Sequence, residues 1–272
     1  MAGGPLWVVL PGMTMPTEDF AALAAALPGE TLVLDAYDAA VTAPAPVVRG
    51  WFRERAAWSK VRLVGHSAGG AAALEWLAAY PAEVECVVLL EPVDIDEKPS
   101  RLRADSPAHR AVSAALVAAG SWPWLARRIG RAGRRAFWRL FTKAPDHLSR
   151  ADVDRIWGNR AALVAVWRQV FERFDQERRV RDWLADRERS RPAGRGPADP
   201  VDPGDDAQAF PPILLVVGDD LEPYLPELAD RLGAELIRTK GDHLFPTRRP
   251  HATAALIATW HANTVCERRG AA

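Results

Sequence analysis

Residues 65–69, which read GHSAG, are the segment whose residue types and spacing point most directly to chemistry. They follow a β-branched, apolar run at 61–64 and lead straight into an alanine-rich stretch. Such a strand–turn–helix context can hold a serine in strained backbone geometry if the residues two positions away on each side lack bulk. Gly65 and Gly69 meet that condition. Ser67 is therefore predicted at the tip of a strand, where the positive end of a helix favours developing negative charge.

Short apolar runs and helical stretches alternate along most of the chain. Most of the apolar runs lack clean alternation, as expected of strands buried on both faces of a parallel sheet. Strands are predicted at 5–10, 31–35, 61–65, 85–91, 212–218 and 234–239, and helices at 17–27, 47–58, 68–80, 224–232 and 250–263. The alternation predicts an α/β fold with a doubly wound, mostly parallel sheet of about six strands.

The alternation of strand and helix stops between Glu91 and Pro211. Helical patterns occupy this gap at 108–119, 122–141, 149–158 and 160–187, and Ser149 with Asp152 forms a capping-box start. The run at 189–206 is rich in proline, glycine and charge, which is typical of an exposed linker. The predicted organisation is a core of residues 1–94 and 207–272, split by a helical insertion at 95–206.

Charge is unevenly distributed between these two parts. The net formal charge of the whole chain is zero, which gives no reason to expect nucleic acid or a membrane surface as a partner. Residues 101–195 nevertheless hold 21 Arg and one Lys against 10 Asp and Glu, a net charge of +12 that the rest of the chain balances. Two explanations remain open: a solvated basic surface, or recruitment of an anionic substrate such as a free acid, a coenzyme A thioester or an anionic lipid.

The cysteines and the N-terminal segment narrow the expected location of the protein. Cys86 and Cys266 are the only cysteines, so no disulfide framework is implied and a reducing, cytoplasmic location is expected. The N-terminal segment has no basic region and only a short apolar run, which fits neither a signal peptide nor a membrane span. The sequence shows no Cys/His spacing suited to zinc, no GxGxxG and no P-loop, so neither a metal nor a cofactor is expected.

With the Gly-x-Ser-x-Gly turn on the third strand and a helical insertion before the fifth, the chain resembles the α/β-hydrolase superfamily over nearly its whole length. The resemblance is to serine esterases and thioesterases with a helical cap. It implies that residues 65–69 form a nucleophile elbow, that the strand order is 2-1-3-4-5-6, and that the insertion is the cap. Ser67 would then lie beside the topological switch point of the sheet.

The family's catalytic triad follows the chain order serine, acid, histidine. An imidazole must take the serine proton during attack, and a carboxylate must hold that imidazole in the right tautomer. His243 has the matching position, after the last strand and before the closing helix. The side chain of His66 is expected to point away from the chemistry. The remaining histidines, predicted to be packed or solvated, are His109, His147, His251 and His261.

The acid of the triad is ambiguous. The family usually carries it in the loop after the fifth strand, three residues beyond a glycine, but here that position is Leu221. Asp220 is favoured because its short side chain needs only a small loop shift, and Glu222 and Asp219 flank the same position. A minority of relatives place the acid after the preceding strand. Glu91 and Asp94 therefore remain alternatives.

The resemblance also implies an oxyanion hole made by two backbone amides. One is that of Ala68, directly after the nucleophile, and the other is that of Met13 in the loop after the first strand. Gly12 would let that loop approach the substrate. The predicted substrate-binding residues are Gly12, Met13 and His66.

The leading functional hypothesis is a serine hydrolase that cleaves a carboxylic ester or thioester of a hydrophobic or polycyclic acid through an acyl-enzyme. Six tryptophans of the insertion are expected mainly to pack the cap, and a few could line a wide apolar pocket; they are Trp122, Trp124, Trp138, Trp157, Trp167 and Trp183. The expected partner is a small-molecule substrate. Acyltransferase, carbon–carbon hydrolase or lyase chemistry, or a non-catalytic ligand-binding receptor, remain alternatives.

Overall fold

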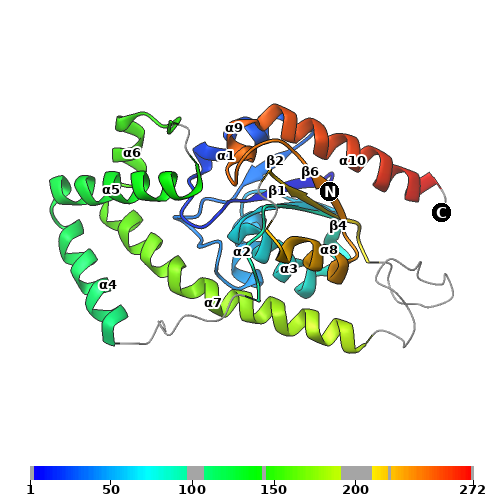
Figure 1. Cartoon of the computed structure of the whole chain (residues 1–272), viewed down its shortest axis with the longest axis horizontal. Helices are drawn as coiled ribbons and strands as arrows, with labels where there is room; N and C mark the ends of the chain where they lie inside the picture. The colour runs from blue at the N-terminus through cyan, green and yellow to red at the C-terminus, as the bar shows by residue number, and fades with distance from the viewer. Residues whose placement is uncertain (1–2, 97–106, 143–144, 191–209, 220–221, 271–272) are drawn as a thin grey trace.

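The computed structural model describes residues 3–96, 107–142, 145–190, 210–219 and 222–270. Its centre is a sheet of six strands, all paired in parallel, in the order β2-β1-β3-β4-β5-β6 (Figure 1). The strands are β1 (Leu6–Leu10), β2 (Thr31–Val33), β3 (Val61–His66), β4 (Val84–Leu90), β5 (Ile213–Val217) and β6 (Glu235–Arg238). The predicted doubly wound α/β fold and the predicted strand order are both confirmed.

Helices cover both faces of the sheet because the strands are apolar on both faces. In β1, Leu6, Val8 and Leu10 pack into one core cluster, whereas Trp7 and Val9 pack into the other. The first face carries α2 (Ala45–Arg53), α3 (Ala68–Ala79) and α8 (Tyr224–Leu232), and the second carries α1 (Thr17–Ala26) and α10 (Pro250–Gly270). Two short elements escaped prediction, the 3₁₀ turn η1 (Pro81–Glu83) and α9 (Phe245–Arg248).

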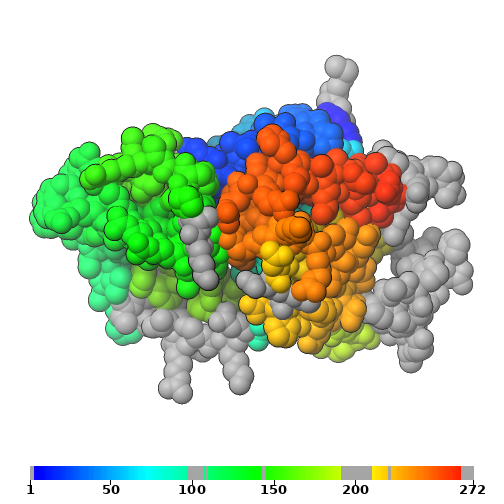
Figure 2. Space-filling view, turned by 45° about the horizontal axis from the view of Figure 1, so that its top comes forward, coloured from blue at the N-terminus to red at the C-terminus, as the bar shows by residue number. Residues whose placement is uncertain are grey.

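The segment between β4 and β5 is helical, as predicted, and its first three helices gather at one end of the molecule (Figures 1 and 2). Its helices are α4 (Pro107–Gly120), α5 (Pro123–Phe141), α6 (Arg150–Ile156) and α7 (Arg160–Arg189). The hydroxyl of Ser149 accepts a hydrogen bond from the amide of Asp152 at 3.1 Å, so α6 begins at the predicted capping residue. The boundary expected at 206–207 lies outside the described residues. None of the described helices is long and apolar enough to cross a membrane.

Helix α7 runs back from the cap along α3 (Figure 1), and two of its buried amides tie it to the core. The side chain of Gln169 donates to the Ala36 carbonyl at 2.9 Å and accepts from the Thr14 amide at 3.1 Å. Gln176 donates to the Val41 carbonyl at 2.9 Å. Because unpaired buried polar groups are costly, these bonds fix the loops after β1 and β2 against the cap.

A second tie between cap and core is a buried ion pair. Arg134 of α5 is only 1% exposed and donates two hydrogen bonds, at 2.8 and 3.1 Å, to the carboxylate of Asp19 in α1. It also donates to Asp146 at 2.8 and 2.9 Å. Burial alone would lower the pKa of Arg134, but the hydrogen bonds to Asp146 and Asp19 raise that pKa above its ordinary value. The guanidinium therefore stays charged inside the interface.

We expect Arg134→Met to lower the free energy of unfolding by about 3–5 kcal/mol, because it leaves the Asp19 carboxylate buried without the arginine. Urea denaturation measures this change. Replacing both partners, Arg134→Met with Asp19→Leu, should recover most of the loss, since an apolar pair carries no buried charge. The matched control is Arg135→Met, an exposed neighbour on the same helix, which should change stability by less than about 0.5 kcal/mol. Equal losses of stability in Arg134→Met and Arg135→Met would contradict a stabilising role for the buried Arg134–Asp19 pair.

Candidate active site

Ser67 lies in the turn between β3 and α3 with φ of 53° and ψ of −120°. The turn is possible because side chains are missing on either side of it. A Cβ atom at Gly65 would overlap the backbone of Gly69, and one at Gly69 would overlap the Leu10 carbonyl group. The two glycines thus allow β3, α3 and the end of β1 to meet around the serine.

Three non-glycine residues have positive φ among the described residues, and all three follow central strands of the sheet. They are Thr14, with φ of 66°, Ser67, with φ of 53°, and Glu91, with φ of 46°. A non-glycine residue in this region is strained by about 1–3 kcal/mol, and such residues cluster at functional sites. The strain therefore marks one edge of the sheet, at the carboxyl ends of β1, β3 and β4.

The loop after β1 lies directly against the serine. A Cβ atom at Gly12 would be 3.0 Å from Nδ1 of His66 and 3.4 Å from Cβ of Ser67, so only glycine fits without displacement. The loop is held from outside as well, since the Tyr37 hydroxyl donates to the Thr14 carbonyl at 3.1 Å. The predicted residues Gly12, Met13 and Ala68 line one cavity together with Ser67 and His243.

That cavity has a volume of about 630 Å³, which suits a small-molecule ligand. Its apolar wall comes from the core and from α5, and consists of Met13, Met15, Val93, Phe137, Leu140 and Phe141. Charged groups also contribute to the lining; besides Glu91 and His243 they are Asp94, Arg173, Glu222 and Asp242. The cavity thus combines an apolar wall with several carboxylates.

His243 lies in the loop between β6 and α9 and reaches the cavity beside Ser67. Its ring stacks on Phe141 of the cap, with 4.7 Å between ring centroids and 28° between planes. Its Nδ1 atom is 3.8 Å from Oε2 of Glu91. Its Nε2 atom is buried and has no hydrogen-bond partner among the described residues. With Nδ1 nearest to Glu91, the second ring nitrogen is left for another partner.

Glu91 is the carboxylate that the structure pairs with His243 within the described chain. It is buried at the end of β4, where its amide donates to the Val216 carbonyl at 3.0 Å and its Oε1 accepts from the Gly218 amide. The separation of 3.8 Å from His243 exceeds a hydrogen bond of 2.7–3.2 Å. Catalytic hydrogen bonds are often this long without substrate and shorten in the reacting complex.

The other acids considered from the sequence have different surroundings. Asp220, the favoured acid, lies outside the described residues. Asp219 accepts a hydrogen bond from the Gly241 amide at 2.9 Å, which directs its carboxylate to that turn. Asp94 accepts from the Asp96 amide at 2.8 Å, and Glu222 is exposed at the cavity lining.

A link between the cap and the histidine loop was missed by sequence reasoning. The hydroxyl of Thr142, at the end of α5, hydrogen-bonds the carboxylate of Asp242, the residue before His243. Arg248 of α9 donates to the same carboxylate at 2.8 Å. Thr142 and Asp242 are 100 positions apart, so no local pattern could have paired them. The end of α5 therefore contacts the histidine loop twice, through Phe141 and through Thr142.

His66 is fully buried beneath the loop that carries His243. Its Nε2 lies 2.8 Å from the His243 carbonyl oxygen, which can only accept, so Nε2 carries the proton. Burial, followed by the charge of His243 nearby, lowers the pKa of His66 to about 3. The neutral ring therefore supports the backbone of His243 from below. Among the other histidines, His147 contacts Asp19 and His261 contacts Glu85.

We expect the buried His66 to make the protein less stable as pH falls. The pKa is 6.5 in the unfolded chain and about 3 in the fold, so only the unfolded chain takes up this proton between those values. Stability from this group is complete above pH 6.5 and is lost below it, by up to about 1.4 kcal/mol per pH unit. Urea denaturation at several pH values measures the slope, which His66→Gln should reduce.

The matched control for this prediction is His251→Gln at an exposed position of α10. It should leave the slope as it is in the unmodified protein. A slope that His66→Gln leaves unchanged would show that another group causes the acid sensitivity.

Comparison with known proteins agrees with the observed fold. Residues 40–220 match the family model described as the alpha/beta hydrolase fold. None of the curated protein sequences compared with the chain matches it. Solved structures do match, but at 14–20% identity they show the fold alone.

Three of these structures illustrate the range of sequence identity and of named activities. A loop variant of the haloalkane dehalogenase DbeA from Bradyrhizobium elkanii is 14% identical with a TM-score of 0.64, covering 100% of this chain and 92% of that one. The epoxide hydrolase CorEH is 16% identical with a TM-score of 0.59, covering 96% and 92%. An alpha/beta hydrolase fold protein from Burkholderia ambifaria is 20% identical with a TM-score of 0.58, covering 94% and 91%.

Proposed function

Because the chain belongs to the α/β-hydrolase fold family, we propose that it is a serine hydrolase that cleaves a carboxylic ester or thioester through an acyl-enzyme on Ser67. The observation that carries the proposal is the elbow itself. Ser67 is held at φ of 53° on the wall of a cavity that His243 also lines. A nucleophile with a base beside it is the minimum arrangement for acyl transfer.

The identity of the nucleophile favours a carbonyl substrate over an alkyl halide or an epoxide. A serine oxygen that attacks a carbonyl forms an ester, which water can hydrolyse to release the free enzyme. If the same oxygen attacked the carbon of an alkyl halide or an epoxide, it would form an ether. Water does not hydrolyse an ether at neutral pH, so the enzyme would not be released. Ser67 is therefore suited to turnover on esters and thioesters, although dehalogenases and epoxide hydrolases share the fold.

We assign the base to His243 and the orienting carboxylate to Glu91. His243 would take the Ser67 proton through Nε2 during attack and return it to the leaving group. Glu91 would accept a hydrogen bond from Nδ1, which requires closing the observed 3.8 Å gap by less than about 1 Å. Its other oxygen is already held by the Gly218 amide, so the carboxylate is oriented before substrate binds. Asp220 is the rival for this role.

The backbone amides of Met13 and Ala68 are the proposed oxyanion hole. Both residues line the cavity beside Ser67, one from the loop after β1 and the other from the first position of α3. The N-terminus of α3 adds favourable potential for an oxyanion. Each such donor is worth roughly 3–4 kcal/mol of transition-state stabilisation.

The lining of the cavity favours a substrate with an apolar acyl group and no negative charge. Phe137, Leu140 and Phe141 present an apolar wall from α5. Arg173 is the one arginine among the described lining residues, and it lies 3.9 Å from the carboxylate of Glu177. The arginine-rich part of the cap lies in other surfaces, so it gives this cavity no anion-binding character.

We expect Ser67→Ala to abolish covalent labelling by a fluorophosphonate and to lower kcat on a p-nitrophenyl ester by at least about 10⁴-fold, because nucleophile and base act as a unit. The free energy of unfolding should change by less than about 0.5 kcal/mol. Ser59→Ala, at an exposed position, is the matched control. Near-normal turnover in Ser67→Ala would refute the acyl-enzyme. Labelling of the unmodified protein without turnover would instead indicate a ligand-binding protein.

Glu91 and Asp220 can be separated by isosteric substitution. We expect Glu91→Gln to lower kcat by about 10⁴-fold, since an amide would hold the imidazole in the wrong tautomer. Asp220→Asn should stay within about tenfold of the unmodified protein, and Glu222→Gln serves as the control at the cavity lining. Steady-state kinetics with one ester measures all three variants. The reverse order of effects would assign the acid to Asp220.

A further inference from the structure

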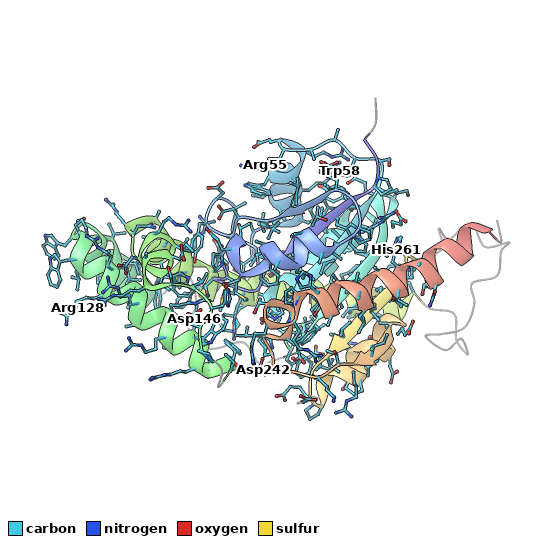
Figure 3. The ribbon with its side chains drawn as sticks, turned by 90° about the horizontal axis from the view of Figure 1, so that it is seen from above. Arg55, Trp58, Arg128, Asp146, Asp242 and His261 are labelled. Atoms are coloured by element: carbon cyan, nitrogen blue, oxygen red, sulfur yellow. The ribbon has the colours of Figure 1, made fainter. Side chains whose placement is uncertain are left out.

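Helix α5 presents an amphipathic face to the outside of the cap. Its buried side is formed by residues four apart: Ala126, Gly130, Arg134 and Trp138. A second side, roughly 120° around the helix, carries residues at i, i+4, i+7, i+11 and i+15, a spacing that aligns them along one face: Trp124, Arg128, Arg131, Arg135 and Arg139. We call these five residues the α5 outer stripe. Figure 3 shows Arg128 projecting outward at the end of the molecule remote from His261.

Two tryptophans at the start of this helix are exposed to solvent. Trp122 is 57% and Trp124 is 59% exposed, which is unusual for the largest apolar side chain. Packing of the cap does not require them, because the cap buries Trp138 and Trp157 instead. Exposed indoles beside arginines are typical of helices that lie in the headgroup layer of a membrane.

The arginines of the stripe are only partly neutralised. Arg131 pairs with Asp154, whereas Arg128, Arg135 and Arg139 form no ion pair with any described residue. Arg135 and Arg139 also line a cleft of about 930 Å³ together with Arg150. Asp146 is the one carboxylate in the described lining of this cleft, and Arg134 holds it by two hydrogen bonds. The outer side of α5 is therefore basic from Arg128, one turn after Trp124, to the cleft at its other end.

We propose that the α5 outer stripe, with Trp122 and Arg150, docks the protein on a bilayer surface that contains anionic phospholipid. The indoles would enter the headgroup layer, and Arg135, Arg139 and Arg150 would receive lipid phosphate in the cleft. Single-stranded nucleic acid fits less well, because it needs aromatic faces for base stacking inside a basic groove. The aromatic residue lining this cleft is Trp138, which is 3% exposed and offers no free ring face.

The docking surface and the active-site cavity share one helix. Phe137 and Phe141 face the cavity from α5, and the exposed Leu140 lies at its lining, whereas the stripe faces outward. Docking would thus bring the apolar wall of the cavity close to a membrane. Binding itself does not depend on the proposed esterase chemistry, so the two can fail separately.

Flotation of the full chain with phosphatidylcholine vesicles, with and without phosphatidylglycerol, tests the proposal. We expect binding only to the anionic vesicles, and weaker binding as salt rises from about 0.01 M to about 0.15 M and shortens the screening length. The triple variant Arg128→Gln, Arg135→Gln, Arg139→Gln should lose about 100-fold in affinity. The matched control, Arg178→Gln, Arg189→Gln, Arg238→Gln, removes the same charge from exposed positions elsewhere and should stay within about threefold.

The indoles are tested by Trp122→Ser with Trp124→Ser, which should weaken binding to anionic vesicles while all five arginines of the basic surface remain. Circular dichroism and hydrolysis of a soluble ester should be unchanged in every variant. Equal binding to both vesicle types, equal losses in the triple variant and its control, or displacement by a single-stranded oligonucleotide at lower concentration than by anionic vesicles would each overturn the proposal.

Discussion

The close approach of three backbone segments around Ser67 is the constraint on which the rest of the site depends. Gly65 and Gly69 have no side chains, so the start of α3 can lie against the carbonyl end of β1. The same closeness places the loop at Gly12 against the serine, where a Cβ atom would lie 2.9 Å from Sδ of Met15, 3.0 Å from Nδ1 of His66 and 3.4 Å from Cβ of Ser67. One packing requirement thus brings the nucleophile and the proposed oxyanion loop together.

The strain at this edge of the sheet is maintained by hydrogen bonds on each strained residue. Ser67 donates its amide to the Leu90 carbonyl at 3.0 Å, and Glu91 donates to Val216 at 3.0 Å, so both are anchored to the adjacent strand. Thr14 lies outside the sheet and is held by Tyr37 and by Gln169 of the cap. Strained conformations persist only where the surroundings over-determine them. The cap is therefore part of the scaffold of the site as well as its cover.

The fold was predictable from the sequence because its signals are local. Apolar runs separated by helical stretches predicted the strands, and the strand before Ser67, the glycines around it and the helix after it identified the elbow. The order of the strands came from the resemblance to the α/β hydrolases, and the sheet confirms it. The pairing of Glu91 with His243 was left among several alternatives, since it depends on how β4 ends with φ of 46° and on a loop far along the chain. The burial of Arg134 was not predicted either, because nothing in an arginine-rich helix distinguishes the one arginine that is buried.

The opposite charges of cap and core have two structural consequences. Some cap arginines pair with core carboxylates across the interface: Arg134 with Asp19, Arg155 with Glu18 at 2.9 Å, and Arg179 with Glu75 at 2.8 Å. These core carboxylates therefore neutralise arginines on the side of the cap that faces the core. The arginines of the α5 outer stripe contact no core carboxylate among the described residues, and Arg131 alone among them has a described carboxylate partner, Asp154 of the cap. A chain with no net charge therefore has a concentrated positive surface, and its potential acts locally because charges farther away than about 8–10 Å are screened at physiological salt.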